Sequence, residues 1–223
     1  MGMIGFPTID ELCAQASAAC GLHDFGSGFE EALGVLRAAI VEDIALSADN
    51  VPRIAGPIVA LLVSRAYSEA GWKRHPRCLA QTIRAPLVVT GLPRTGTTAL
   101  HKLMAVDQRF QGLQTWLLDS PMPRPPRETW TDYPAFHRTA ATLEARFKAA
   151  PKKRAAHNMA AEEVDECCLV LRQGFVSNLW TVGWSAATYD AWWQCQSEES
   201  SYRHYYRCLQ LIGSTEPDKR WLL

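Results

Sequence analysis

The stretch "LVVTGLPRTGTTALHKLM", from Leu87 to Met104, decides the fold of this chain. A short apolar, β-branched run leads into a glycine-containing turn and then into a helical pattern, which is the context of a phosphate-binding loop. Gly91, Gly96 and Thr98 match the nucleoside triphosphatase pattern G-x-x-x-x-G-K-[ST]. Thr97 stands where that pattern has lysine. The sequence therefore predicts a phosphate loop of a different kind.

The residues of this loop suit a phosphate but not ATP hydrolysis. Gly91 permits a tight turn, and Gly96 lets the backbone approach an oxygen closely. Arg94 adds a permanent charge with a planar fork, and the neighbouring threonine hydroxyls add donors. Thr97 cannot supply the charge that the missing lysine places between the β- and γ-phosphates, and no acidic strand end suggests a magnesium site.

The composition indicates a globular protein whose affinity for anions is local. Of the 223 residues, 48% are hydrophobic and 21% are charged, as in core-forming domains. Lys plus Arg and Asp plus Glu number 23 each, which argues against a nucleic-acid partner or a polybasic membrane anchor. Seven cysteines without a C-x-x-C pair indicate reduced thiols. With no signal peptide and no apolar run long enough for a transmembrane segment, we expect a cytoplasmic location.

The pattern along the chain predicts two parts, a helical segment over 1–84 and an α/β part over 85–223. In the first part, 29–46 is an amphipathic helix and a second helix runs from about 57 to 69. In the second part, 86–92 and 112–118 are expected to be strands, the first buried in a parallel sheet, and "KRWLL" (219–223) begins another buried strand. Further helices are expected over 95–106, 135–150, 160–173 and 197–213.

The loop and four further blocks resemble one known family. "GLPRTGTT", "VDQRF", "TW", "AHNMAAEEVDECC" and "KRWLL" follow one another as in bacterial sulfotransferases that carry P-R-[TS]-G-T-T where the better-known cytosolic enzymes carry P-K-S-G-T-T. The resemblance covers roughly 84–223. It implies a P-loop-type three-layer α/β fold with a central parallel sheet, here incomplete at the C-terminus, preceded by an N-terminal helical segment.

The resemblance implies transfer of a sulfuryl group from 3′-phosphoadenosine-5′-phosphosulfate (PAPS) to a hydroxyl or amine of a small-molecule, lipid or glycan acceptor, with no metal required. By resemblance, Arg94 takes the place of the family's catalytic lysine at the 5′-phosphate and the bridging oxygen. Arginine keeps its proton at neutral pH, so this role is electrostatic. The resemblance implies that the cofactor-binding residues are Pro93, Arg94, Thr95, Gly96, Thr97 and Thr98.

The catalytic base is expected in an acidic block that contains one histidine. The candidates are His157, which a carboxylate would orient, and Glu162 or Glu166. The alternative is that His157 lies on a surface loop and that the acids, with Glu163 and Asp165, only complement a helix dipole. Trp180, Trp184, Tyr189 and the aromatic residues around them are expected to pack helices rather than to line an acceptor site.

Two other functions remain open beside PAPS-dependent transfer, because part of the family's cofactor site has no counterpart in this sequence. The family's 3′-phosphate site, an Arg and a Ser that follow "RWLL", has no counterpart in these 223 residues. The chain therefore resembles the N-terminal part of a sulfotransferase. The alternatives to PAPS-dependent transfer are a non-catalytic fragment that keeps a phosphate-binding loop or an interaction surface, and a nucleotide kinase-like P-loop protein.

Overall fold

The computed structural model describes residues 5–92, 95–156 and 158–223. The chain divides into two compact units. Unit 1 comprises Met1–Ala70 and Cys168–Cys208, and unit 2 comprises Gly71–Cys167 and Leu209–Leu223. Both units therefore contain segments from each side of the division predicted after residue 84.

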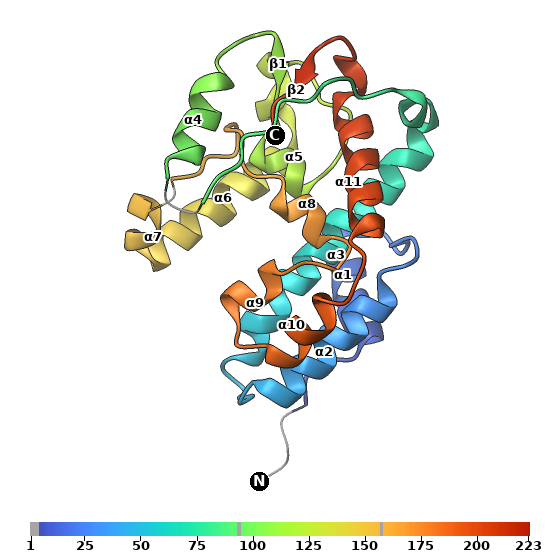
Figure 1. Cartoon of the computed structure of the whole chain (residues 1–223), viewed down its shortest axis with the longest axis vertical. Helices are drawn as coiled ribbons and strands as arrows, with labels where there is room; N and C mark the ends of the chain where they lie inside the picture. The colour runs from blue at the N-terminus through green and yellow to red at the C-terminus, as the bar shows by residue number, and fades with distance from the viewer. Residues whose placement is uncertain (1–4, 93–94, 157) are drawn as a thin grey trace. The chain divides into compact units, whose positions relative to one another are not determined.

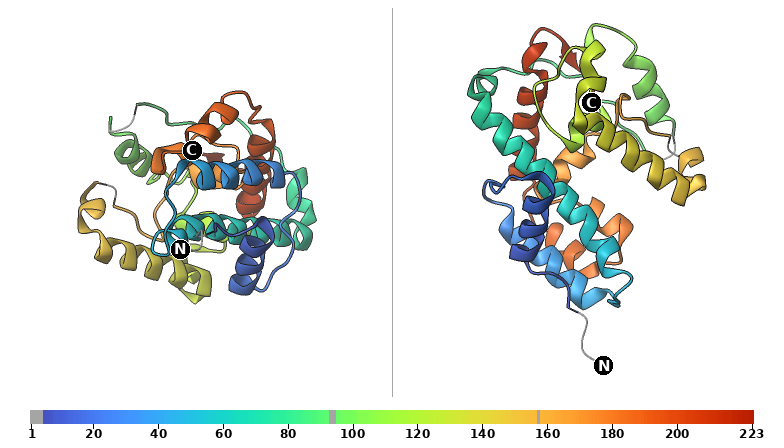
Figure 2. Two further views of the ribbon diagram at one scale, coloured as in Figure 1. Left: turned by 90° about the horizontal axis from the view of Figure 1, so that it is seen from below. Right: turned by 180° about the vertical axis from the view of Figure 1, so that it is seen from behind.

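Unit 1 is helical. The N-terminal helix α1 (Ile9–Cys20) begins at a capping box, in which Thr8 and Glu11 satisfy each other's backbone N–H groups. Figures 1 and 2 show the blue to cyan helices α1, α2 and α3 beside the orange helices α9 and α10. The helices that lie wholly in unit 1, or begin there, are α2 (Glu30–Asp43), α3 (Val51–Arg74), α8 (Cys168–Arg172), α9 (Leu179–Gly183), α10 (Ala187–Trp193) and α11 (Glu199–Ile212).

The core of unit 1 joins the early helices to the aromatic segment that comes late in the chain. Leu33, Leu36 and Ile40 of α2 are fully buried, as their spacing of three and four predicts. Trp180 and Tyr189 are buried in the same cluster. The predicted amphipathic helix and the packing interpretation of these aromatic residues are confirmed, whereas α3 is longer than predicted at both ends.

Unit 2 holds a small parallel sheet. Strand β1 (Phe110–Gln111) pairs in parallel with β2 (Arg220–Trp221). On the other side of β2, Leu87 forms a parallel bridge with Leu222, and the Val89 N–H donates to the Leu223 carbonyl at 2.7 Å. The last strand in sequence is thus the middle one of the three, as Figure 1 shows near the C-terminus. The strand expected in "KRWLL" and the parallel pairing of the first strand are confirmed.

Helices and an aromatic cluster surround this sheet. Trp116 is fully buried, with ring centroids of Trp130, Tyr133 and Phe136 within 5.7–6.0 Å of its own. The other elements of unit 2 are η1 (Pro76–Ala80), α4 (Thr97–Met104), α5 (Thr115–Asp119), η2 (Arg127–Asp132), α6 (Pro134–Ala149), α7 (Pro151–Ala156) and η3 (Gly213–Thr215).

Three predictions about local structure are wrong. The strand expected over 112–118 is helix α5 for most of its length, and β1 ends just before it. The helix expected over 160–173 begins only at Cys168, because Val164 bridges Gln114 in an antiparallel pair. The strand over 86–92 is not buried, since Val88 is 59% exposed. In the first two cases tertiary contacts between 113–116 and 161–165, which the local pattern does not contain, determine the outcome.

No helix among the described residues combines the length and the apolar character needed to cross a bilayer.

Candidate active site

The turn between the first strand and α4 leaves backbone N–H groups without a cap. Gly96, the residue before α4, has φ 96° in the left-handed region, which favours glycine. Because Gly96 has no side chain, it cannot cap the N–H groups of the first helical turn. Those groups, together with the positive end of the helix dipole, could hold an anion.

Two further residues shape this turn. A Cβ atom at Gly91 would lie 3.0 Å from the Thr97 methyl carbon and 3.2 Å from the Thr95 hydroxyl, so a side chain there would crowd the turn. The Thr95 hydroxyl donates to the Leu92 carbonyl at 2.7 Å. The Thr95 hydroxyl, which the sequence predicted to bind phosphate, therefore already donates its proton within the protein. Thr97 and Thr98 are half-buried on the first turn of α4.

The acidic block lies at the same edge of the sheet as the glycine turn. The Asp165 N–H donates to the Leu113 carbonyl at 2.8 Å, and the Thr115 N–H donates to the Glu163 carbonyl at 3.0 Å. Leu113 and Thr115 follow the carboxyl end of β1, and the glycine turn follows the carboxyl end of the Leu87 strand. Carboxyl ends of parallel strands share one edge of a sheet, where ligands of open α/β folds bind.

The carboxylates of this block differ in exposure. Glu162 and Glu166 are exposed, and Asp165 is buried. The Glu166 N–H donates to the Asp165 carboxylate at 2.8 Å. The two exposed glutamates can accept a proton from a ligand in solvent, whereas Asp165 holds the backbone of the block.

Lys102 of α4 joins the helix to this block and was missed in the sequence. Its Nζ lies 2.6 Å from the Glu163 carboxylate and 2.7 Å from the Asn158 carbonyl oxygen. The two charged side chains are 27% and 36% exposed. The contact spans sixty-one positions, so no local pattern could have found it.

His101 lies beneath the site rather than in it. It is 6% exposed, and burial lowers the pKa of its imidazole below the ordinary value. A hydrogen bond with the backbone of Leu222 and the charges of Asp165 and Glu166 oppose that shift. The Nε2 atom has no hydrogen-bond partner among the described residues. This placement is consistent with a structural histidine.

A small cavity opens beside the acidic block. It has a volume of about 290 Å³ and lies between α6 and the segment that leads to Glu162. Leu143, Phe147 and Met159 give it apolar walls. The Arg154 guanidinium lies 5.7 Å from the centroid of the Phe147 ring at its rim. An apolar body with a polar group near Glu162 fits these walls.

The structure thus covers only part of the predicted site. Thr95, Gly96, Thr97 and Thr98 form the turn and the helix start, and Glu162 and Glu166 belong to a block at the same sheet edge. Pro93, Arg94 and His157 lie outside the described residues. No cluster of three or more metal-ligating side chains occurs within the described ranges.

Comparisons with known proteins identify the family and the fold of the chain. A family model described as the sulfotransferase family matches residues 86–220. The crystal structure of sulfotransferase STF1 from Mycobacterium tuberculosis H37Rv is similar at 38% identity and a TM-score of 0.89, over 97% of this chain and 60% of that one. Sulfotransferase STF9 from Mycobacterium avium matches at 24% identity and a TM-score of 0.84, over 100% of this chain and 58% of that one.

These matches confirm the predicted fold class, an α/β fold with a parallel sheet preceded by helices. The likeness to the M. avium protein concerns the fold alone. The chain spans about three fifths of the length of the two solved structures, 60% and 58%. No protein of curated function matches the chain.

Proposed function

This chain belongs to the sulfotransferase family, and from that membership we propose that it transfers a sulfuryl group from PAPS to a hydroxyl or amine of a small acceptor. The observation that carries the proposal is the uncapped turn at Gly96, which starts α4 at the edge of the sheet where the acidic block also lies. The seven free cysteines support the cytoplasm as the proposed location.

The glycine turn fits the 5′-phosphosulfate end of the donor. The N–H groups of Thr97 and Thr98 and their hydroxyls would hold phosphate oxygens. Arg94 would neutralise the charge that develops on the leaving phosphate as the sulfur–oxygen bond to it breaks. The sulfuryl group carries less charge than a phosphoryl group, so the proposal requires no metal.

The acidic block would supply the base. As the acceptor oxygen or nitrogen bonds to sulfur, its proton passes to His157, Glu162 or Glu166. Glu162 has additional support, because it also lines the apolar cavity between α6 and Met159. That cavity favours an acceptor with an apolar body, either a small molecule or the end of a lipid, over a glycan.

A calorimetric titration tests the donor site. Adenosine 3′,5′-bisphosphate, the product left after sulfuryl transfer, should bind without metal, and ATP with Mg²⁺ should not compete with it. Metal-dependent binding of ATP would instead support a kinase-like protein. If neither nucleotide binds, the non-catalytic alternative is correct.

Arg94 gives the sharper test of the chemistry. We expect Arg94→Ala to slow sulfuryl transfer to a panel of phenols and fatty alcohols by at least about ten- to a hundredfold, because one charge-assisted contact at the leaving oxygen contributes about 1.5–3 kcal/mol. Arg94→Lys should retain part of the rate. Activity of Arg94→Ala close to that of the unmodified chain would rule out the role at the leaving group.

A further inference from the structure

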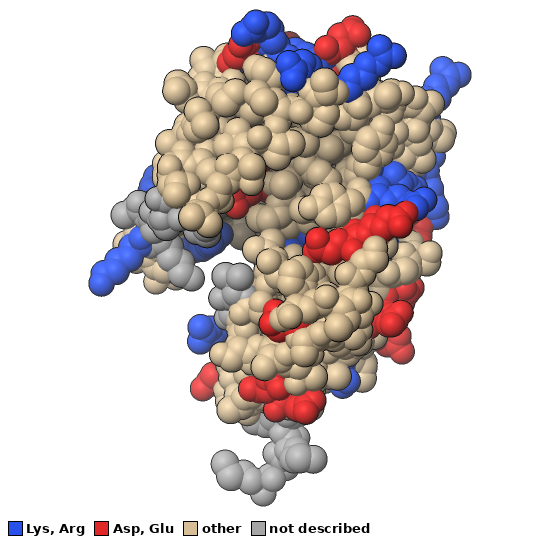
Figure 3. Space-filling view, viewed as in Figure 1, with Lys and Arg blue, Asp and Glu red and all other residues tan. Residues whose placement is uncertain are grey.

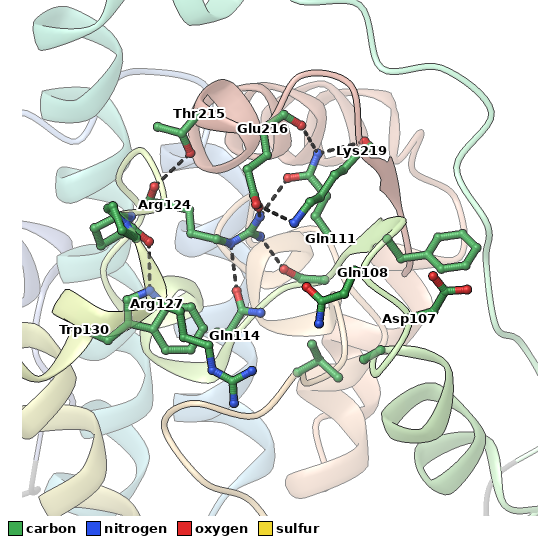
Figure 4. Close-up of a pocket in the computed structure, with 16 residues that line it drawn as sticks. Asp107, Gln108, Gln111, Gln114, Arg124, Arg127, Trp130, Thr215, Glu216 and Lys219 are labelled. Atoms are coloured by element: carbon green, nitrogen blue, oxygen red, sulfur yellow. Dashed lines mark hydrogen bonds and ion pairs between the residues drawn. The ribbon is translucent and has the colours of Figure 1, made fainter.

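A second pocket in unit 2 lies along the outer edge of β1. We call it the edge pocket; Gln108, Phe110, Gln114, Arg127, Trp130 and Val164 are among the residues that line it. Its volume is about 490 Å³, within the ordinary range for small-molecule sites. Figure 4 shows the side chains of Gln108, Gln114 and Arg127 around one opening, with Trp130 behind Arg127.

The edge pocket is separate from the glycine turn. Its described lining begins at Ala105, just past the C-terminal end of α4, whereas the glycine turn precedes the N-terminal end. The eight residues of α4 place about 12 Å of helix between them. None of the described residues that line the pocket belongs to the glycine turn or to 158–163.

The deepest polar group of the edge pocket is already satisfied. Arg124 is 6% exposed, and it donates to Gln114, Gln111, Glu216 and the Gly112 carbonyl at 2.5–3.0 Å. Burial raises the pKa of Glu216, but hydrogen bonds from Lys219 and Arg124 outweigh this and hold it below its ordinary value. Arg124 and Glu216 therefore form the floor of the pocket and bind no ligand.

Three polar side chains at the opening are available to a ligand: the neutral amides of Gln108 and Gln114 and the guanidinium of Arg127. Gln114 Oε1 accepts a hydrogen bond from Arg124 Nε at 3.0 Å. The NH₂ group of Gln114 has no hydrogen-bond partner in the described part of the chain and can donate to a ligand. Within the same described part, the Gln108 amide makes no hydrogen bond and the Arg127 guanidinium makes no ion pair. The Arg127 guanidinium lies 5.9 Å from the centroid of the Trp130 ring.

The charges around the opening leave a positive excess. The Asp107 carboxylate is held by Arg109 at 2.5 Å, and Glu216 is shared by Arg124 and Lys219. Arg127 is thus the charged lining residue that no described carboxylate compensates. An anion with two acceptor oxygens matches a guanidinium fork flanked by amide donors.

The walls of the edge pocket indicate what kind of body carries the anionic group. Phe110, Pro125, Trp130 and Val164 line it with apolar atoms, and the small exposed part of Trp130, 7% of its surface, can contact an aromatic body. From these observations we propose that the edge pocket binds a small aromatic carboxylate, with Arg127, Gln108 and Gln114 at the carboxylate and Trp130 against the ring. The proposal does not depend on sulfuryl transfer.

The test is an NMR titration of the full chain with benzoate, following the side-chain amide signals of Gln108 and Gln114 and the indole N–H of Trp130. We expect saturable shifts of these signals. Benzamide, which lacks the charge, should bind at least about tenfold more weakly, since a hydrogen bond to a charged group contributes about 1.5–3 kcal/mol. Acetate, which lacks the ring, should also bind more weakly, because it buries none of the apolar surface that the ring buries.

Two variants make the assignment specific. Arg127→Gln should weaken benzoate binding by about ten- to a hundredfold, whereas the control Arg77→Gln removes an exposed arginine elsewhere in unit 2 and should leave it unchanged. Gln108→Leu should weaken binding less than Arg127→Gln does. Both substituted side chains in the edge pocket are exposed, so the variants should keep the melting temperature of the chain.

Three results would overturn the proposal. They are the absence of shifts at millimolar benzoate, equal binding by Arg127→Gln and the unmodified chain, and displacement of benzoate by adenosine bisphosphate, which would assign it to the glycine turn. Loss of nucleotide binding with benzoate binding retained would count against the proposed function alone.

Discussion

At the scale of single residues, Gly96 is the position where sequence, backbone and chemistry meet. Its φ of 96° suits glycine, and apart from its chain neighbours no described residue has a heavy atom within 4 Å of a Cβ built there. The requirement for glycine is therefore one of backbone conformation and not of space. Because the same backbone conformation aims the first N–H groups of α4, a change there should affect stability and anion binding together.

Gly96→Ala should lower the free energy of unfolding by roughly 1–2 kcal/mol, the cost of a left-handed conformation for a residue with a Cβ, and should weaken binding of adenosine bisphosphate. Urea unfolding and calorimetry measure the two effects. The matched control is Gly34→Ala inside α2, where a Cβ would lie 3.8 Å from Ile9 Cδ1; it should stabilise by about 0.5–1 kcal/mol. Equal behaviour of the two variants would contradict the backbone argument.

At the scale of elements, the acidic block shows where the sequence pattern failed. Acids followed by an apolar stretch are typical of a helix start, yet 161–163 form a turn and a bend, and Val164 bridges Gln114 after β1. The hydrogen bonds to Leu113 and Thr115 satisfy backbone groups that a helix would otherwise satisfy internally. As a result the block is fixed to the sheet edge and tied to α4 by Lys102.

Lys102→Met should slow sulfuryl transfer by about ten- to a hundredfold, because small displacements of catalytic groups have effects of that size. The loss of stability should stay below about 1 kcal/mol, since the ion pair is partly exposed. Steady-state kinetics and thermal unfolding check both expectations. Lys148→Met, at an exposed position of α6, is the control and should change neither. A large fall in melting temperature with an unchanged rate would mean that Lys102 only stabilises the fold.

In unit 1, the helices α3 and α11 are joined by a buried polar network. Arg65 donates to the carbonyl oxygens of Phe25, Ser27 and Gln173, and its Nη1 lies 3.3 Å from His204 Nδ1. Arginine can only donate, so Nδ1 accepts and Nε2–H donates to Gln173 Oε1 at 2.8 Å. The network therefore requires a neutral His204.

Acidification should destabilise this network. Burial, followed by the charges of Arg65 and Arg207, lowers the pKa of His204 to about 3. Between about pH 6.5 and 3 the unfolded chain binds a proton that the folded chain does not. The free energy of unfolding should therefore fall with decreasing pH in that window, by up to about 1.4 kcal/mol per pH unit. Urea unfolding at several pH values should show a shallower fall for His204→Gln. Parallel curves for the two proteins would refute this account.

At the scale of the whole molecule, an apolar surface on α4 is open to solvent. Leu100 and Leu103 of α4 are 48% and 71% exposed, and Val106, two residues after the end of α4, is 72% exposed. Figure 3 shows a broad area without charged side chains in the region where Figure 1 draws α4. Exposed apolar surface of this kind promotes association between molecules.

The double variant Leu103→Gln and Val106→Gln should remain monomeric at higher protein concentration than the unmodified chain, because it removes most of this surface. Light scattering over a concentration series measures the effect. Val41→Gln changes an exposed apolar residue in α2 and should make little difference. If the control improves solubility equally, the α4 surface has no special part in association.

The sequence by itself determined the features that depend on neighbouring residues. The glycine turn, the start of α4, the amphipathic α2 and the parallel character of the sheet follow from local sterics and from hydrophobic spacing, which act over a few positions. The family resemblance rests on the same local blocks. This is why the fold class could be predicted from the sequence, and why the loop chemistry is a prediction that rests on local residues alone.

Only the tertiary structure decided which distant segments meet. The pairing of Lys102 with Glu163, of Arg124 with Glu216, and of the acidic block with the exit of β1 each joins residues separated by about fifty or more positions. Such contacts form only when segments far apart in the sequence come together. Their energies offset the entropy lost on closing the intervening loops, which no local sequence pattern encodes. The edge pocket belongs to this second class, because its lining comes from four separate stretches of unit 2.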